Sequence, residues 1–268
     1  VHWWLGRRGQ EEPCRHWANA APRQDIKGRR RRGCGGQDWW ESHEGNGREP
    51  ARVSFRGCVM VDSKTFWDKM APKYAESQMR SVEDYEHTLA RTLSHLTPEM
   101  RVLEMGCGTG TTALRLAPHV KAFVGTDQSS EMIRIARDKA ADEHSNLEFR
   151  VLGAAESAQL EEGFDVVMGF NLFHLVPDAD AVLADIFKML KPGGLMISKT
   201  PCLMDKAFGW KRFLVAGMLP ILKRIGKAPD VGLWRIADVD RRIADAGFET
   251  LEAGNFPAIS RYVVARKI

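Results

Sequence analysis

The sequence Arg101-Val102-Leu103-Glu104-Met105-Gly106-Cys107-Gly108-Thr109-Gly110 is a short apolar run followed by three alternating glycines. The apolar run predicts a buried strand. The glycines predict a sharp turn at its carboxyl end, because a chain without Cβ atoms can turn tightly and lets a ligand approach the backbone. The stretch therefore predicts a nucleoside-cofactor site, with Glu104 lying under the loop.

A second acid stands at the position such a site requires. Residues 121–127 predict the next strand, which ends in Asp127, 17 residues after Gly110. An acid there can accept hydrogen bonds from both hydroxyls of a ribose. A dinucleotide fingerprint needs Gly-x-Gly-x-x-Gly, whereas this loop has Gly-x-Gly-x-Gly followed by Thr111 and Thr112. This spacing, and the lack of a Tyr-x-x-x-Lys pair near a later strand, argue against an NAD-dependent oxidoreductase.

With these motifs, residues 60–268 resemble the class I S-adenosylmethionine-dependent methyltransferases, whose glycine loop follows the pattern acid-x-Gly-x-Gly-x-Gly. The resemblance implies a Rossmann-like methyltransferase fold: a doubly wound, seven-stranded, mostly parallel sheet with an antiparallel C-terminal edge hairpin. It also implies S-adenosylmethionine as the cofactor. Several residues match positions that hold the cofactor in this family: Tyr74, Glu104, Gly106, Gly108, Gly110, Asp127, Gln128, Ala155 and Asn171.

Each of these residues is expected to contact a different part of the cofactor. The glycines wrap the methionine and ribose, Glu104 holds the loop or reaches the ammonium through water, and Asp127 takes the ribose hydroxyls. For Asp127 the structural alternative is a surface acid that caps the next helix. Gln128 flanks the adenine, and Tyr74 closes over the cofactor carboxylate or packs in the core. The family often has an acid or amide where this chain has Ala154, so adenine recognition falls to the Ala155 backbone or to Glu156.

The segment Gly169-Phe170-Asn171-Leu172-Phe173-His174 resembles the family segment that faces the methyl group. Asn171 is expected to contact the methionine ammonium through its backbone carbonyl. His174 is the catalytic candidate, because an imidazole near neutrality can remove a proton from the acceptor. The alternatives are that His174 orients the substrate or caps the following helix. Alignment alone drives much of a methyl transfer, so a base is not obligatory.

The pattern around the loop alternates strands with helices and by itself predicts a doubly wound parallel sheet. Ser129 predicts a helix cap, and Lys191-Pro192-Gly193-Gly194 predicts an abrupt helix end. Two late strands, Phe248–Ala253 and Tyr262–Arg266, are close enough to pair as a hairpin. The other expected strands are 101–105, 121–126, 147–152, 164–170 and 194–199, and the expected helices between them are 110–117, 129–142 and 178–190.

Three parts are expected along the chain. Residues 1–59 contain five of the eight tryptophans and the run Arg29–Arg32 without a helical or strand period, which predicts a disordered or artefactual leader before a start at Met60. The alternative is a nucleic-acid tether. Residues 60–98 predict an N-terminal helical cap, and residues 99–268 the methyltransferase domain.

Composition excludes several classes. No apolar run reaches the roughly 20 residues of a membrane span, and none near the start resembles a signal peptide, so the expectation is a cytoplasmic protein. The cysteines form no zinc or disulfide pattern, and no cluster of acids suggests a metal, so none is expected. Residues 1–57 carry 12 Lys and Arg against 7 Asp and Glu, which leaves 27 against 28 in the rest of the chain. Nucleic acid is therefore not the expected substrate.

The segment 201–233 is expected to insert a substrate lid. Residues 213–222 are apolar, and basic residues lie on both sides of them within 206–227. Such a segment can roof a greasy pocket or make a peripheral contact with an anionic membrane, and the alternative is an ordinary helix packed on the domain. The predicted activity is methyl transfer from S-adenosylmethionine to a small, hydrophobic or lipid-like acceptor. The rivals are a soluble polar acceptor and a non-catalytic cofactor-binding protein of the same fold.

Overall fold

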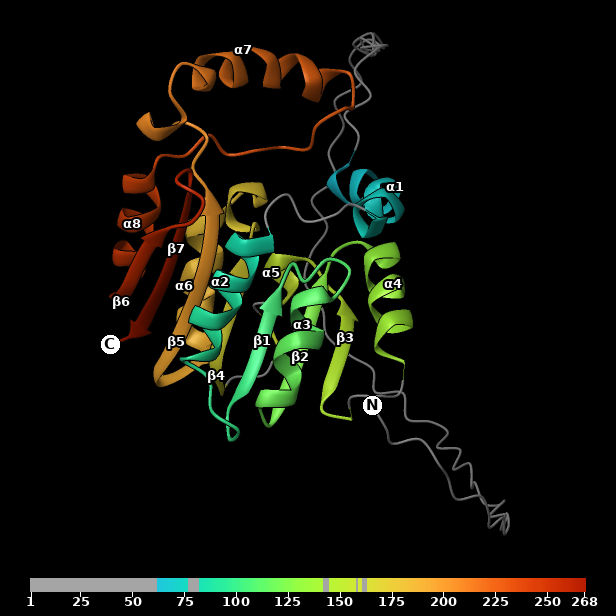
Figure 1. The fold of residues 1–268 in the computed structure, drawn as a ribbon, viewed down its shortest axis with the longest axis vertical. Coiled ribbons are helices and arrows are strands. Elements are labelled where there is room, and N and C mark those ends of the chain that lie inside the picture. The colour runs from blue at the N-terminus through green and yellow to red at the C-terminus, as the bar shows by residue number, and fades with distance from the viewer. Residues whose placement is uncertain (1–61, 77–81, 142–144, 158, 161–162) are drawn as a thin grey trace, which may run out of the picture. The chain divides into compact units, whose positions relative to one another are not determined.

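The computed structural model describes residues 62–76, 82–141, 145–157, 159–160 and 163–268, so the predicted leader lies outside the described residues. Its centre is a seven-stranded sheet in the order β3-β2-β1-β4-β5-β7-β6 (Figure 1). The first five strands are parallel, and β7 is antiparallel to both β5 and β6. The predicted doubly wound sheet with its antiparallel C-terminal hairpin is confirmed. The strands are β1 Arg101–Met105, β2 Ala122–Asp127, β3 Leu147–Val151, β4 Phe164–Phe170, β5 Leu190–Pro201, β6 Phe248–Asn255 and β7 Ser260–Lys267.

Helices cover both faces of this sheet because each face is lined with apolar side chains. On one face α2, α3 and α4 pack over β1, β2 and β3. On the other face α6 packs over β4 and β5, α8 packs over β6 and β7, and the short α5 contacts β2 and α6. The α-helices are α1 Ser63–Glu76, α2 Val82–Leu93, α3 Thr111–Leu116, α4 Ser130–Ala140, α5 Ala154–Ser157, α6 Ala179–Met189, α7 Lys211–Arg224 and α8 Ile236–Asp245, and the short 3-10 helices are η1 Ala117–His119, η2 Phe173–Leu175 and η3 Lys206–Phe208.

Local chemistry accounts for most helix boundaries. Ser129 caps α4 by accepting a hydrogen bond from the Met132 amide, and Asp178 caps α6 in the same way. The helix expected over 110–117 is shorter, because its last turn tightens into η1.

The expected strand 194–199 is wrong at both ends. β5 begins at Leu190, directly after α6, so the segment Lys191-Pro192-Gly193-Gly194 that was expected to end the helix lies within the strand. There the pairing with β4 jumps from Phe164–Leu190 to Val166–Leu195, which marks a bulge. Because of the bulge, β5 includes the Pro-Gly-Gly segment, which in the sequence predicts the end of a helix.

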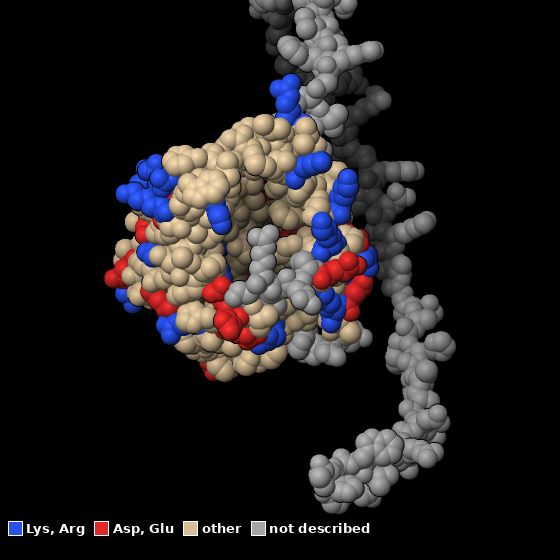
Figure 2. Space-filling model, turned by 45° about the horizontal axis from the view of Figure 1, so that its top comes forward, with Lys and Arg blue, Asp and Glu red and all other residues tan. Residues whose placement is uncertain are grey.

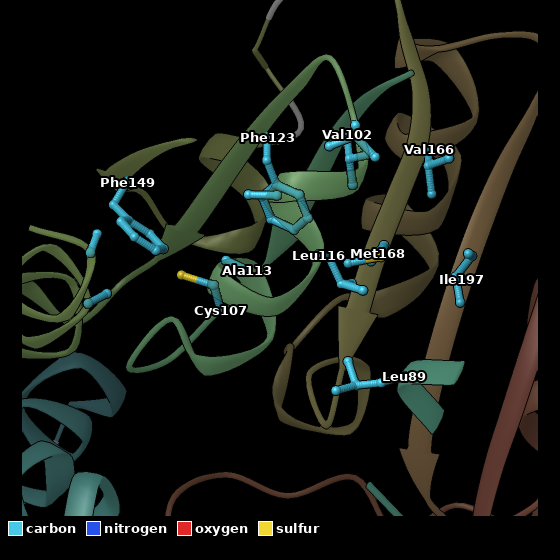
Figure 3. Close-up of a cluster of buried hydrophobic side chains, with 14 of the residues drawn as sticks. Leu89, Val102, Cys107, Ala113, Leu116, Phe123, Phe149, Val166, Met168 and Ile197 are labelled. Carbon is cyan, nitrogen blue, oxygen red and sulfur yellow. The ribbon is translucent and has the colours of Figure 1, made fainter. Parts of the chain in front are cut away.

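Figure 3 shows the apolar cluster that supports the glycine loop. Cys107 points into this cluster and is 7% exposed. Burial raises the pKa of its thiol well above the ordinary value. Cys107 is therefore a small core residue beneath a tight turn rather than a reactive thiolate.

Candidate functional site

The loop between β1 and α3 needs its glycines for two different reasons. Gly106, Gly108 and Gly110 all have positive φ, between +55° and +74°. A Cβ atom on Gly110 would come within 2.7 Å of the Phe149 ring and 2.8 Å of Ala136, so this glycine packs against the core. A Cβ on Gly108 would meet only Tyr74, at 3.7 Å. Gly108 is thus the glycine whose backbone faces open space at the site.

Asp127, at the end of β2, ties this loop to the next helix. One carboxylate oxygen accepts from the Gly108 amide at 3.0 Å, and the other accepts from the Ser129 amide at 2.9 Å. The pKa of Asp127 is raised overall, because burial raises it more than these two hydrogen bonds lower it. Each oxygen has a further lone pair, so the predicted ribose contact and the helix-capping alternative are compatible.

Glu104 lies in β1, next to Gly125 of β2, and is only 3% exposed. Its Oε2 atom is buried without a hydrogen-bond partner among the described residues. Burial, with a smaller contribution from the negative charge of Asp127, raises the pKa of Glu104 to about 8. A buried carboxyl group without a partner is costly, and a cationic ligand group placed beside it would remove that cost.

Tyr74, in α1, lies beside the same loop. The residue is 48% exposed as a whole. Burial of its hydroxyl end raises the pKa of the phenol, and the charges of Asp127 and Glu104 raise it further. The Tyr74 ring lies beside Gly108 of the loop, and its closure over the cofactor carboxylate stays a prediction.

Asp68 anchors α1 in this position, and no pattern in the sequence points to it. Its carboxylate accepts from the Ser129 hydroxyl at 2.7 Å and from the Glu131 amide at 3.2 Å, so it holds the start of α4. The hydrogen bond from Ser129 is the largest cause of its lowered pKa. α1 and α4 pack together through this contact.

The adenine end expected from the sequence is built from β2 and β3. A Cβ on Gly153 would lie 4.0 Å from the Gln128 side chain, so these two residues face each other. One oxygen of Glu156 is occupied by the Gly153 amide at 2.7 Å. Ala155 is exposed on α5. The structure brings Gln128 and Gly153 together and leaves the Ala155 surface open to a ligand.

The segment after β4 contacts the glycine loop at Gly106. Asn171 has a positive φ of +55°, and its amide donates to the Lys199 carbonyl at 2.7 Å. Leu172 then packs on the glycine loop, because a Cβ on Gly106 would come within 2.8 Å of the Leu172 side chain. Leu172 is a second site residue that the sequence did not single out.

His174 follows in η2 and is 9% exposed. Burial lowers the pKa of its imidazole to about 4. Its Nδ1 has no hydrogen-bond partner among the described residues, while its carbonyl accepts from the Gly232 amide. His174 lines a pocket of about 270 Å³ together with Trp234 and Arg242. The imidazole is therefore neutral at pH 7 and has a free nitrogen.

These residues fit a nucleoside cofactor that carries a cationic group. The open backbone at Gly108, the carboxylate of Asp127 and the unpartnered oxygen of Glu104 lie around one loop. The residues around that loop could hold the ribose, the adenine and an ammonium group. In the described part of the chain, no group of three or more His, Cys, Asp or Glu residues is placed to hold a metal ion. Nor does any helix there have the length and apolar character to cross a membrane.

Comparison with known proteins agrees with this geometry. Residues 102–194 match a family described as a methyltransferase domain. A ubiquinone biosynthesis O-methyltransferase from Rhizobium etli is 30% identical over 150 residues, which are 56% of this chain and 60% of that protein. The chain thus matches less than two thirds of the length of such curated relatives.

Solved structures share the fold at low identity. A Haloferax volcanii protein in complex with the Trm112 methyltransferase activator has a TM-score of 0.64 at 17% identity and covers 77% of this chain and 97% of its own. The [4+2]-cyclase SpnF has a TM-score of 0.60 at 18% identity, with 79% and 98% covered. Residues 102–194 therefore match a methyltransferase domain, within a sheet that has the Rossmann-like methyltransferase fold, and this agrees with S-adenosylmethionine as the cofactor.

Proposed function

We propose that this protein transfers a methyl group from S-adenosylmethionine to a small, hydrophobic or lipid-like acceptor. The observation that carries the proposal is Glu104, which is buried beneath the glycine loop with one oxygen unpartnered and with its pKa raised to about 8. A folded protein rarely retains such a group unless a ligand satisfies it.

The acceptor class rests on the surroundings of the site. Figure 2 shows a hollow in one face, and its visible walls are mainly residues that are neither acidic nor basic. Such walls favour an uncharged molecule over a charged one. A curated relative is named as acting in ubiquinone biosynthesis, and a quinone precursor is an acceptor of this kind.

His174 is the proposed proton acceptor. The bound cofactor supplies an electrophilic methyl carbon on a sulfonium. When the acceptor hydroxyl oxygen takes this methyl group, the carbon–sulfur bond would break and S-adenosylhomocysteine would leave with the electron pair. The methylated oxygen would then carry a strongly acidic proton, which even an imidazole with a pKa of about 4 could take. The Nδ1 atom of His174 is buried without a hydrogen-bond partner among the described residues, so this step requires that the acceptor reach that nitrogen.

The cofactor site is tested by titrating S-adenosylhomocysteine into the full chain by calorimetry. Asp127→Ala should weaken binding about tenfold to a hundredfold, because hydrogen bonds to a charged group contribute about 1.5–3 kcal/mol. Asp138→Ala, an exposed acid on α4 that pairs with Arg134, is the matched control and should bind like the wild type. If the folded wild-type chain does not bind the ligand, the proposal is wrong and a non-catalytic role is favoured.

The acceptor class is tested with a catechol that carries a prenyl tail and the same catechol without the tail. A hydrophobic acceptor site predicts that the tail raises kcat/KM by about tenfold or more, since each buried CH₂ contributes about 0.8 kcal/mol. Equal kcat/KM for the two compounds would favour a soluble polar acceptor. Binding of the cofactor without turnover of any acceptor would point to other chemistry on this fold, as in the cyclase SpnF.

A further inference from the structure

Helix α7 and the residues at its two ends expose a continuous stripe of large apolar side chains. The spacing of the stripe is three or four residues, so its members lie on one face of the helix. Each is between 50% and 68% exposed. The outer stripe consists of Trp210, Phe213, Leu214, Met218, Ile221 and Ile225.

The opposite face of α7 is apolar as well, but it is only half-buried. Val215, Leu219 and Leu222 lie there, and none of the helix residues is buried. A helix that is apolar on all sides is normally found inside a protein or in a membrane. An exposed apolar face of this kind marks an interaction surface.

The charges at both ends of α7 indicate what covers the outer stripe. Residues 206–229 contain no Asp or Glu. Lys211 and Arg212 lie in the first turn, where the positive end of the helix dipole disfavours cations, so helix stability does not explain them. Together with basic residues before the helix, in its last turn and after it, they form a basic border around the stripe: Lys206, Lys211, Arg212, Lys223, Arg224 and Lys227. Of these, Lys223 pairs with Asp230.

From the apolar stripe and its basic border we infer that α7 binds the surface of an anionic lipid bilayer. The outer stripe enters the headgroup region, and the basic border contacts lipid phosphates, as in interfacial amphipathic helices. Figure 1 shows α7 beyond the carboxyl ends of the parallel strands, the same end of the sheet as the glycine loop. Membrane binding does not depend on the proposed methyl transfer, although it would bring lipid-like acceptors to this end of the domain.

The test is sedimentation of the full chain with vesicles. One set of vesicles is pure phosphatidylcholine, and the other has one part phosphatidylglycerol to three parts phosphatidylcholine. The wild type should bind the anionic vesicles more tightly and lose binding at high salt. The double variant Phe213→Glu/Ile221→Glu should weaken binding about tenfold or more. The double variant Lys211→Glu/Arg212→Glu should weaken it for anionic vesicles alone.

Matched controls distinguish lipid binding by α7 from misfolding and from self-association. Leu251→Glu, which changes an exposed leucine on β6, should bind vesicles like the wild type. S-adenosylhomocysteine affinity should be unchanged in every variant, which shows that each folds and keeps this test apart from the test of methyl transfer. Equal vesicle binding by wild type and Phe213→Glu/Ile221→Glu would overturn the inference. So would loss of binding on replacing only Arg29–Arg32, or a concentration-dependent dimer that the same double variant abolishes.

Discussion

Two carboxylates at different places on the sheet have opposite environments. Glu104 in β1 is buried, has an unpartnered oxygen and has a pKa raised to about 8. Glu252 in β6 accepts two hydrogen bonds from Arg91 and one from His95. The hydrogen bonds from Arg91 are the main cause that lowers the pKa of Glu252 to about 2.

The difference separates a ligand site from a structural contact. At the β6 edge every polar atom of the glutamate side chain has a partner from α2 or the turn that follows it, so the contact stabilises the fold by itself. At the glycine loop the protein leaves an acceptor buried without a partner among the described residues, which lowers stability until something binds. The His174 Nδ1 atom is left in the same condition.

The largest effect is expected from Glu104→Gln. Because the folded pKa of Glu104 is raised above its ordinary value of 4.5, the protein loses stability as the pH rises from about 4.5 through about 8. The loss amounts to about 4 kcal/mol. The glutamine variant should lack this loss, so in the absence of ligand it should be the more stable protein at pH 8. Urea unfolding at a series of pH values measures this.

The same variant should bind the cofactor product more weakly. At pH 7 the wild type should release protons when S-adenosylhomocysteine binds, because the ligand ammonium favours the ionised carboxylate. Calorimetry in buffers of different ionisation enthalpy detects the release. Proton release that persists in Glu104→Gln would show that another group takes this role.

A smaller effect is expected from Gly110→Ala. The methyl group would meet Phe149 and Ala136 at less than 3 Å, at a residue with φ of +74°. Overpacking and left-handed strain together should lower the free energy of unfolding by about 3 kcal/mol. Gly193→Ala is the matched control, because its φ is +75° and nothing lies within 4 Å. The control should cost about 1 kcal/mol, and equal losses for the two variants would contradict the packing role.

Sequence and structure agree where local pattern decides the outcome. The doubly wound sheet, the cap at Ser129 and the positions of Glu104 and Asp127 follow from apolar periodicity and turn residues, whereas the seven-stranded order with a reversed last strand followed from the family resemblance. Contacts between distant segments could not be predicted in this way. Asp68 bonds to the start of α4 across about sixty residues, and no periodicity encodes such a pairing. Leu172 likewise reaches Gly106 only because β4 lies beside β1.

The exposure of α7 could not be predicted from the sequence either. A short apolar run with a helical period looks the same whether the helix is buried or exposed. Only the structure shows that none of its residues is buried. The same holds for β5, where a Pro-Gly-Gly segment that usually marks a break is absorbed by a bulge.

His174→Gln should lower kcat by about a hundredfold with a hydroxyl acceptor, the usual contribution of a general base at its lower end. S-adenosylhomocysteine affinity should stay within about twofold of the wild type. Because the pKa of His174 is lowered to about 4, wild-type kcat should fall only as the pH drops below about 5. A glutamine variant with unchanged kcat would leave His174 an orienting or structural role.

The smallest effect is expected at the other carboxylate, from Glu252→Gln. The contact is partly exposed, so solvent screening limits its contribution to about 1–2 kcal/mol at pH 7. Because the folded pKa of Glu252 is lowered to about 2, this stability is present above about pH 4.5 and is lost as the pH falls toward 2. The variant should therefore unfold more easily at pH 7 but with less dependence on acid, and it should bind S-adenosylhomocysteine like the wild type. Weaker ligand binding in Glu252→Gln would mean that the β6 edge is coupled to the cofactor loop, and the two carboxylates would no longer stand for separate regions of the domain.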